Sequence, residues 1–136
     1  MRIMAVDYGD RRTGIAVSDL TNSIVGQAWT VTQSVAARLV ELIAAEARSR
    51  GVGTIVVGSP RNMDGTFGSR AEKSAGLAEA LRAETDCDVR LWDERRTTVD
   101  AHRILSEANR RGEKRKQSVD AVAASLILEG YLNSIK

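Results

Sequence analysis

The sequence is poor in the residue types that form disulfides, zinc sites and aromatic stacking surfaces. It has one cysteine, Cys87, so no disulfide can form within the chain. It has one histidine, His102, and therefore no cluster of cysteine and histidine ligands of the kind that binds zinc. Aromatic residues make up only 4% of the chain, which disfavours a single-strand nucleic-acid binder that works by stacking bases.

Long apolar runs are also missing, and none approaches the roughly 20 residues that a membrane-spanning helix requires. The N-terminus passes directly into an apolar strand without a signal-peptide pattern, so we expect a cytoplasmic protein with no membrane contact. Internal repeats, low-complexity stretches and linkers are absent. With 136 residues, of which 43% are hydrophobic and 28% charged, the sequence predicts a single globular domain spanning residues 1–136.

The net charge of +2 is too small to indicate a polyanionic partner by itself. The distribution of charge is more informative, because basic residues crowd into positions 110–116, opposed only by Glu113, and recur in the pairs Arg11–Arg12 and Arg95–Arg96. Local clusters of this kind can bind phosphates even when the charge of the whole chain is low. For 110–116 alone, an ordinary solvated loop is a fair alternative.

Hydrophobic patterning predicts strands over residues 2–7, 13–18, 24–31, 54–57 and 89–92. Helical spacing predicts helices over 35–50, ended by Gly51, and over 69–84, begun by a capping box of Ser69 and Glu72. A further helix is expected after Thr97 or Thr98. The last helix is expected to be capped by Ser118, with the apolar side Val119, Val122, Ala123, Leu126 and Ile127.

This order of elements predicts an α/β domain with a mixed five-stranded sheet and helices on both faces. The first three strands are joined by short turns and are expected to be antiparallel, whereas the later strands follow helices and are expected to be parallel. The apolar strand 2–7 is expected at the centre of the sheet, and the short strand 89–92 near its edge.

Acidic residues follow several of these elements. In the predicted sheet the strands 2–7, 54–57 and 89–92 are parallel, so Asp7 and one of Asp93 and Glu94 are expected at a shared edge. Periodicity does not choose between Asp93 and Glu94, which point to opposite faces of a strand. Asp19 ends an antiparallel strand and is expected at the far edge as a turn or cap residue.

Asp120 has two interpretations. In the first turn of the last helix, a carboxylate gains roughly 0.3–1 kcal/mol from the helix dipole, which is a purely structural use. The same part of the helix is apolar on nearly every side, which indicates burial and would bring Asp120 close to the sheet. If these acids converge, a divalent metal and phosphodiester cleavage are the expected chemistry, because carboxylates in apolar surroundings need a compensating charge.

Two glycines follow Asp7. Gly9 permits a tight turn and Gly14 permits close backbone approach. A similar Asp-x-Gly segment occurs in sugar kinases, actin and the heat-shock ATPases. These proteins need two such domains to enclose ATP, and 136 residues cannot supply both. The nucleotide-binding interpretation is therefore weak unless the protein dimerises around the ligand.

Several motifs in order resemble the YqgF/RuvX family, a bacterial branch of the RNase H-like nucleases, over almost the whole chain. These motifs are Asp7-Tyr8-Gly9 with Arg12 and Gly14, Val57-Gly58 with Pro60 and 62–66, Arg70-Ala71-Glu72-Lys73, 91–95 with Thr97-Thr98, Lys114-Arg115-Lys116, and Val119-Asp120-Ala121. The sequence departs from the usual pattern at Arg11, Thr13, Ser69 and Arg96, and none of these departures removes an acid.

The resemblance implies an RNase H-like fold and the acids Asp7, Glu94 and Asp120, which favours Glu94 over Asp93. These three residues are expected to be catalytic and to bind one or two Mg²⁺ or Mn²⁺ ions through oxygen ligands. The residues expected to contact nucleic acid are Arg12, Arg61, Asn62, Arg95, Lys114, Arg115 and Lys116.

The implied function is metal-dependent hydrolysis of phosphodiester bonds in the 5′-end maturation of precursor 16S rRNA. One alternative is a Holliday junction resolvase or another structure-specific DNA nuclease, and another is a non-catalytic nucleic-acid-binding module. Precursor rRNA is the favoured partner, with branched or single-stranded DNA and the small ribosomal subunit as further candidates. The chain is expected to be a monomer or a homodimer.

Overall fold

The computed structural model describes residues 1–59, 68–93 and 116–135. Its sheet contains the strands β1 (Arg2–Asp7), β2 (Arg12–Ser18), β3 (Val25–Thr32), β4 (Val52–Ser59) and β5 (Asp88–Asp93). The described helices are α1 (Ala36–Ser49), α2 (Ser69–Glu84) and α4 (Lys116–Ser134). None of these helices is long and apolar enough to cross a membrane.

The five strands lie in the order β3-β2-β1-β4-β5. The pairs β1–β2 and β2–β3 are antiparallel, whereas β4 is parallel to both β1 and β5. The predicted mixed sheet is confirmed, with β1 at its centre and β5 at one edge. The C-terminal ends of β1, β4 and β5 therefore lie along the same edge of the sheet.

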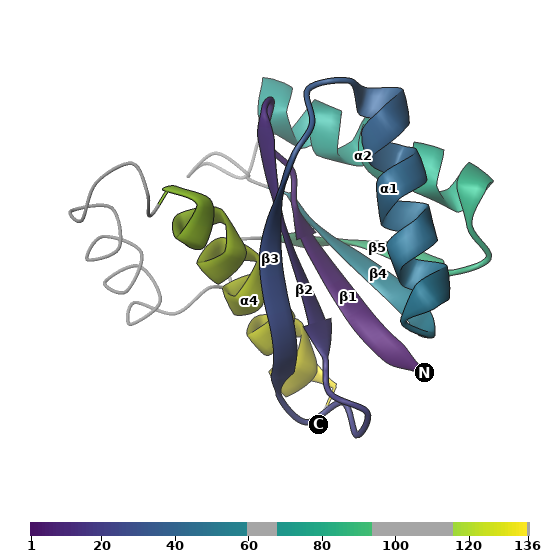
Figure 1. Cartoon of the computed structure of the whole chain (residues 1–136), viewed down its shortest axis with the longest axis vertical. Helices are drawn as coiled ribbons and strands as arrows, with labels where there is room; N and C mark the ends of the chain where they lie inside the picture. The colour runs from purple at the N-terminus through teal and green to yellow at the C-terminus, as the bar shows by residue number, and fades with distance from the viewer. Residues whose placement is uncertain (60–67, 94–115, 136) are drawn as a thin grey trace.

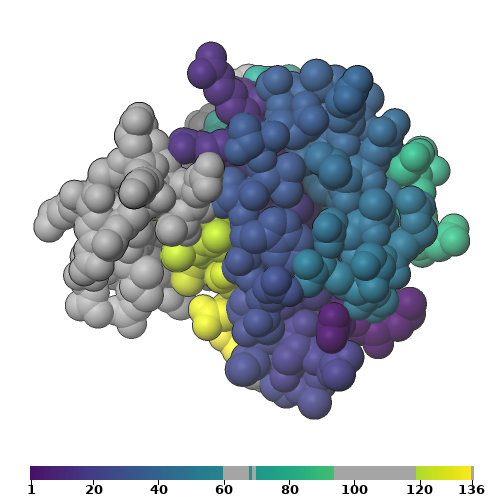
Figure 2. Space-filling model, in the orientation of Figure 1, coloured from purple at the N-terminus to yellow at the C-terminus, as the bar shows by residue number. Residues whose placement is uncertain are grey.

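The core has two layers, because successive side chains of a strand point to opposite faces. On one face, Met4 and Val6 of β1 pack with α1 and α2. On the other face, Ile3 and Ala5 of β1 pack with α4. Figure 1 shows this arrangement, in which α1 and α2 cover one side of the sheet and α4 crosses the other. Side chains of β3 and α1 lie in the middle of the surface seen in Figure 2.

Local signals account for some of the element boundaries. Gly51 ends α1 as predicted and has a φ of 67°, in the left-handed region that glycine adopts without strain. The predicted capping box of Ser69 and Glu72 is wrong. The N-cap of α2 is Gly68, whose carbonyl oxygen accepts the backbone N–H of Glu72 at 3.2 Å, so Ser69 is already helical.

The start and the buried side of α4 also differ from prediction. The chain is already helical at Lys116, so Ser118 lies inside the helix and Asp120 lies beyond its first turn. The residues that α4 buries are Ala124, Ile127, Leu128, Tyr131 and Leu132, and only Ile127 belongs to the predicted apolar side. Residues 97–109, over which a further helix is expected, lie outside the described residues, as does His102.

Candidate active site

Asp7 is the last residue of the central strand and points to the face of the sheet that α4 covers. Ile3 and Ala5 pack toward α4, and strand alternation gives Asp7 the same side. Asp7 is half-buried and pairs with Gly14 of β2 in the antiparallel register. The chain thus places one carboxylate at the C-terminal edge of the sheet, under the beginning of α4.

Gly14 brings the second carboxylate to the same place. A Cβ atom added at Gly14 would lie 1.9 Å from the carbonyl oxygen of Asp120 and 2.5 Å from its carbonyl carbon. The backbone of α4 therefore rests directly on β2 at the position that pairs with Asp7. The close approach expected at Gly14 is confirmed, and it is the helix carrying Asp120 that makes it.

A second glycine lies on the other side of Asp7. Val6 pairs with Val57 of β4, so the next residue of β4 in register is Gly58, which pairs in turn with Trp92 of β5. Across the face under α4, Asp7 thus has a residue without a side chain on each side. On the Gly14 side, the missing side chain is what lets the backbone of α4 approach and deliver Asp120.

Asp120 is held in an environment that is costly for a negative charge. Its side chain is 23% exposed, and Oδ2 is buried without a hydrogen-bond donor among the described residues. Arg12 Nε lies 3.3 Å from Oδ2, which makes an ion pair but not a well-aligned hydrogen bond. Burial raises the pKa of Asp120, while the charges of Arg12 and Arg70 oppose that rise.

Asp93 does not share this face. Trp92 packs with α4, its ring meeting Tyr131 edge to face at 5.8 Å, as expected for core packing rather than base stacking. Its neighbour Asp93 therefore points to the opposite side of the sheet by strand alternation. Strand alternation thus places Asp93 on the face opposite to that of Asp7. Glu94, the third expected acid, lies outside the described residues.

The described residues supply two of the three expected acids, and within that part of the chain no group of three acidic, cysteine or histidine residues surrounds a common point. The two that are described fit a hard divalent cation. Both ligands are carboxylates, and the unsatisfied Oδ2 of Asp120 needs a positive partner in addition to Arg12.

Among the residues expected to contact nucleic acid, Arg12 begins β2 and lies beside Asp120. Lys116 is the first residue of α4, and its side chain is not described. The other five lie outside the described residues, and these are Arg61, Asn62, Arg95, Lys114 and Arg115.

The structure adds Arg70 to the site, a residue that the sequence did not single out as a ligand-binding group. Arg70 lies in the first turn of α2, and its Nη2 atom donates a hydrogen bond to the carbonyl oxygen of Tyr8 at 3.3 Å. Tyr8 directly follows Asp7, so a residue 62 positions away reaches the acid pair. The signal in the sequence was the motif Arg70-Ala71-Glu72-Lys73, whose basic residues had no assigned role.

At the opposite edge of the sheet, Asp19 has a structural role, as predicted. Its carboxylate accepts hydrogen bonds from Thr21 Oγ1 at 2.7 Å and from the backbone N–H groups of Ser23 at 2.8 Å and Ile24 at 3.3 Å. The hydrogen bonds from Thr21 and then Ser23 lower the pKa of Asp19. Asp19 thus stabilises the turn between β2 and β3.

Solved structures with the same fold define the class of the domain. The RuvC protein of T. thermophilus in complex with a Holliday junction substrate has a TM-score of 0.65 at 12% identity, covering 100% of this chain and 97% of that one. The Fowlpox virus resolvase in complex with Holliday junction DNA has a TM-score of 0.62 at 13% identity, with 99% of both chains covered. The domain has the RNase H-like fold of the RuvC-like resolvases.

Sequence similarity is more specific. A model of the RuvX family, described as "Holliday junction resolvase", matches residues 1–134. A relative from Halothermothrix orenii is 44% identical over 98% of this chain and 95% of its own, and one from Pelotomaculum thermopropionicum is 42% identical over 98% and 88%. Both are named "Putative pre-16S rRNA nuclease". The chain belongs to the RuvX family.

Proposed function

We propose that this protein is a metal-dependent nuclease that hydrolyses phosphodiester bonds in precursor 16S rRNA during maturation of its 5′ end. The observation that carries the proposal is the contact of the α4 backbone with Gly14, which brings Asp120 to the strand position paired with Asp7. The names of the relatives favour precursor rRNA as the substrate. Membership of the RuvX family favours nuclease chemistry.

Asp7 and Asp120 are the proposed ligands of one or two Mg²⁺ or Mn²⁺ ions, together with Glu94. Glu94 is favoured over Asp93 by the resemblance to the family, and because Asp93 follows Trp92, which packs with α4, so that strand alternation turns Asp93 to the other face. When bound, such ions supply an activated water for in-line attack and stabilise the leaving 3′ oxygen. Arg12 opposes the protonation of Asp120 and can position the substrate strand beside it.

The other residues expected to contact nucleic acid are proposed to bind phosphates of the substrate. Lys114, Arg115 and Lys116 directly precede or begin α4, the helix that carries Asp120, and Arg61, Asn62 and Arg95 follow β4 and β5 along the chain. Phosphate contacts by such residues predict an affinity that falls steeply with salt concentration.

The test is cleavage of a labelled precursor rRNA 5′ leader, with Mn²⁺ or with EDTA, by the wild type and by Asp7→Ala. Cleavage that is lost in EDTA and in the variant supports the enzyme. Binding of RNA without cleavage under any of these conditions would instead support a non-catalytic binding module, and the proposal of nuclease activity would be wrong.

Resolution of Holliday junctions is a second candidate, favoured by the description of the family and by the likeness to resolvases bound to junction DNA. A four-way junction has two-fold symmetry, so a resolvase is expected to act as a homodimer. Light scattering together with cleavage of an immobile junction distinguishes the candidates. A monomer that cuts the rRNA leader and leaves the junction intact excludes the second one.

A further inference from the structure

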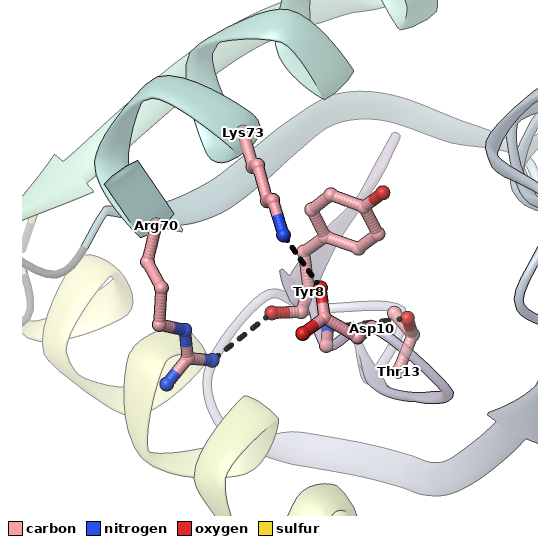
Figure 3. Close-up of polar contacts among 6 residues, drawn as sticks. Tyr8, Asp10, Thr13, Arg70 and Lys73 are labelled. Carbon is pink, nitrogen blue, oxygen red and sulfur yellow. Dashed lines mark hydrogen bonds and ion pairs between the residues drawn. The ribbon is translucent and has the colours of Figure 1, made fainter. Parts of the chain in front are cut away.

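The β1–β2 turn is connected to the start of α2 by two basic side chains. Arg70 donates a hydrogen bond from Nη2 to the carbonyl oxygen of Tyr8 at 3.3 Å, and Lys73 Nζ pairs with Asp10 Oδ1 at 3.0 Å. Figure 3 shows both side chains extending from α2 to the turn that follows Asp7. The two contacts have similar lengths, but Lys73 pairs with a charged carboxylate whereas Arg70 donates to a neutral carbonyl group.

The positive charge of Lys73 is balanced by the carboxylate of Asp10. Its ammonium group and the Asp10 carboxylate form an exposed ion pair, with side chains that are 56% and 79% exposed. The hydrogen bond and the charge of Lys73 lower the pKa of Asp10, as expected for a carboxylate that stays ionised beside its partner. Lys73 therefore brings little net positive charge to this edge of the sheet.

Among the described residues, Arg70 uses little of its capacity to donate hydrogen bonds. A guanidinium group has five N–H donors, and the one hydrogen bond of Arg70 among the described residues goes to a neutral carbonyl group. Arg70 is exposed, and its charge acts on Asp120 as well as on Asp10. Arg12 reaches Asp120 from β2 and Arg70 acts on it from α2, so two cations from different elements adjoin the acid pair.

Contacts other than that of Arg70 also hold the turn. Thr13 Oγ1 accepts the N–H of Gly9 at 3.4 Å, the carbonyl oxygen of Arg11 accepts the N–H of Gln33 at 3.0 Å, and Lys73 holds Asp10. The hydrogen bond of Arg70 to Tyr8 adds to these contacts and uses one of its five donors. Its planar fork of donors suits the two non-bridging oxygens of a phosphodiester, which a lysine contacts only as a point charge.

We propose that Arg70 is a substrate-binding residue whose guanidinium group contacts the non-bridging oxygens of the backbone phosphate that enters the site beside Asp7 and Asp120. This inference rests on the proposed function, because it takes nucleic acid as the ligand of the site. The carbonyl group of Tyr8 holds the guanidinium toward the acid pair through one N–H group. The remaining donors face the phosphate.

The test is the salt dependence of nucleic-acid binding in EDTA, where cleavage is absent. The probes are a fluorescein-labelled single-stranded RNA and a labelled four-way DNA junction, and the variants are Arg70→Gln, Arg70→Lys and the matched control Lys73→Gln. Because one phosphate contact is lost, Arg70→Gln is expected to reduce the slope of log K against log salt by about 1. Lys73→Gln is expected to leave the slope unchanged, since Lys73 is already paired.

Arg70→Lys separates charge from geometry. It is expected to keep the salt slope, and with Mn²⁺ to raise KM for cleavage, because it retains the charge and loses the fork. Equal slopes for the wild type and Arg70→Gln on both probes, with an unchanged melting temperature, would overturn the proposal. So would a failure of the wild type to bind either probe. Wild-type protein that binds but never cleaves contradicts only the nuclease function, and the slopes still decide the role of Arg70.

Discussion

Asp19 and Asp120 lie at opposite ends of the strands of one sheet. Their surroundings differ in the hydrogen-bond donors that stabilise a negative charge. The turn around Asp19 donates three hydrogen bonds to its carboxylate within five residues of the chain. Asp120 is more buried, and its Oδ2 atom has an ion pair with Arg12 but no hydrogen bond among the described residues. The pKa of Asp19 is lowered by its hydrogen bonds, whereas burial raises the pKa of Asp120.

We interpret the difference as that between a carboxylate that serves the fold and one that would be held for the proposed ligand. A local turn can satisfy a carboxylate completely, because the chain supplies the donors next to it in sequence. A helix packed on a sheet cannot do this for Asp120, because the helix amides near it are used within the helix. The carboxylate of Asp120, which has the ion pair with Arg12 but no hydrogen bond to Oδ2 among the described residues, then offers an oxygen to a cation, and shifted pKa values of this kind are frequent at functional sites.

The largest expected effect is on catalysis, and it distinguishes the two acids directly. Replacing Asp120 by Asn should reduce metal-dependent cleavage at least about a hundredfold, because a proposed ligand loses its charge. Asp19→Asn should cleave at the normal rate, since it lies at the far edge of the sheet. The measurement is kcat/KM on the rRNA leader with Mn²⁺. An Asp120→Asn protein that cuts normally would falsify its assigned role.

The second prediction concerns the contact that brings Asp120 to the sheet. Gly14→Ala places a Cβ atom 1.9 Å from the carbonyl oxygen of Asp120, so α4 must move away from β2. We expect a loss of roughly 1–3 kcal/mol in the free energy of unfolding, and a displacement of about 1 Å can cost about a hundredfold in rate.

Gly76→Ala is the matched control for Gly14→Ala. Gly76 lies within α2, and a Cβ atom there meets no other atom within 4 Å. Alanine is the better helix former, so this variant should gain about 0.5–1 kcal/mol and keep its activity. Urea unfolding and cleavage assays report both quantities. A Gly14→Ala protein as stable and active as the wild type would show that α4 does not need this approach.

The sequence predicted those features of the fold and the site that depend on short local patterns of residues. The antiparallel and parallel pairing of the strands, the position of Asp7, the close approach at Gly14 and the structural role of Asp19 all followed from runs of a few residues. The buried side of α4 did not, because the helix is apolar on nearly every side and hydrophobic spacing selects no face. Only packing shows that Ala124, Ile127 and Tyr131 face the sheet. This stripe begins one helical turn after Asp120.

Arg70 illustrates the other kind of information that the sequence lacked. Its hydrogen bond to Tyr8 joins residues 62 positions apart, and only the parallel pairing of β1 with β4 brings α2 to the turn. The capping box was also wrong, since its residue types matched while the N-cap lies one residue earlier, at Gly68.

A third prediction tests whether the charge of Asp120 is held for a cation. Mn²⁺ at about 100 times its dissociation constant should stabilise the wild type by about 2.7 kcal/mol, because the ion binds the folded state. The stabilisation should be greatly reduced in Asp120→Asn and unchanged in Asp19→Asn, whose carboxylate is occupied by its own turn. Thermal unfolding with and without Mn²⁺ measures it. Equal shifts in all three proteins would contradict a site at Asp120.

The smallest effect is the pH dependence of stability without metal, where the two acids should have opposite signs. The folded-state pKa of Asp19 is lowered, so its carboxylate stabilises the fold above the unfolded value of about 3.9, and this contribution is lost as the pH falls through the folded pKa. The folded-state pKa of Asp120 is raised, so the ionised group destabilises the fold at neutral pH and the penalty disappears on acidification.

In urea unfolding with EDTA, Asp19→Asn should therefore be less stable than the wild type at pH 7, and Asp120→Asn more stable. Both differences should shrink toward acid pH. Differences of the same sign at pH 7 would show that the two carboxylates are not held in opposite ways.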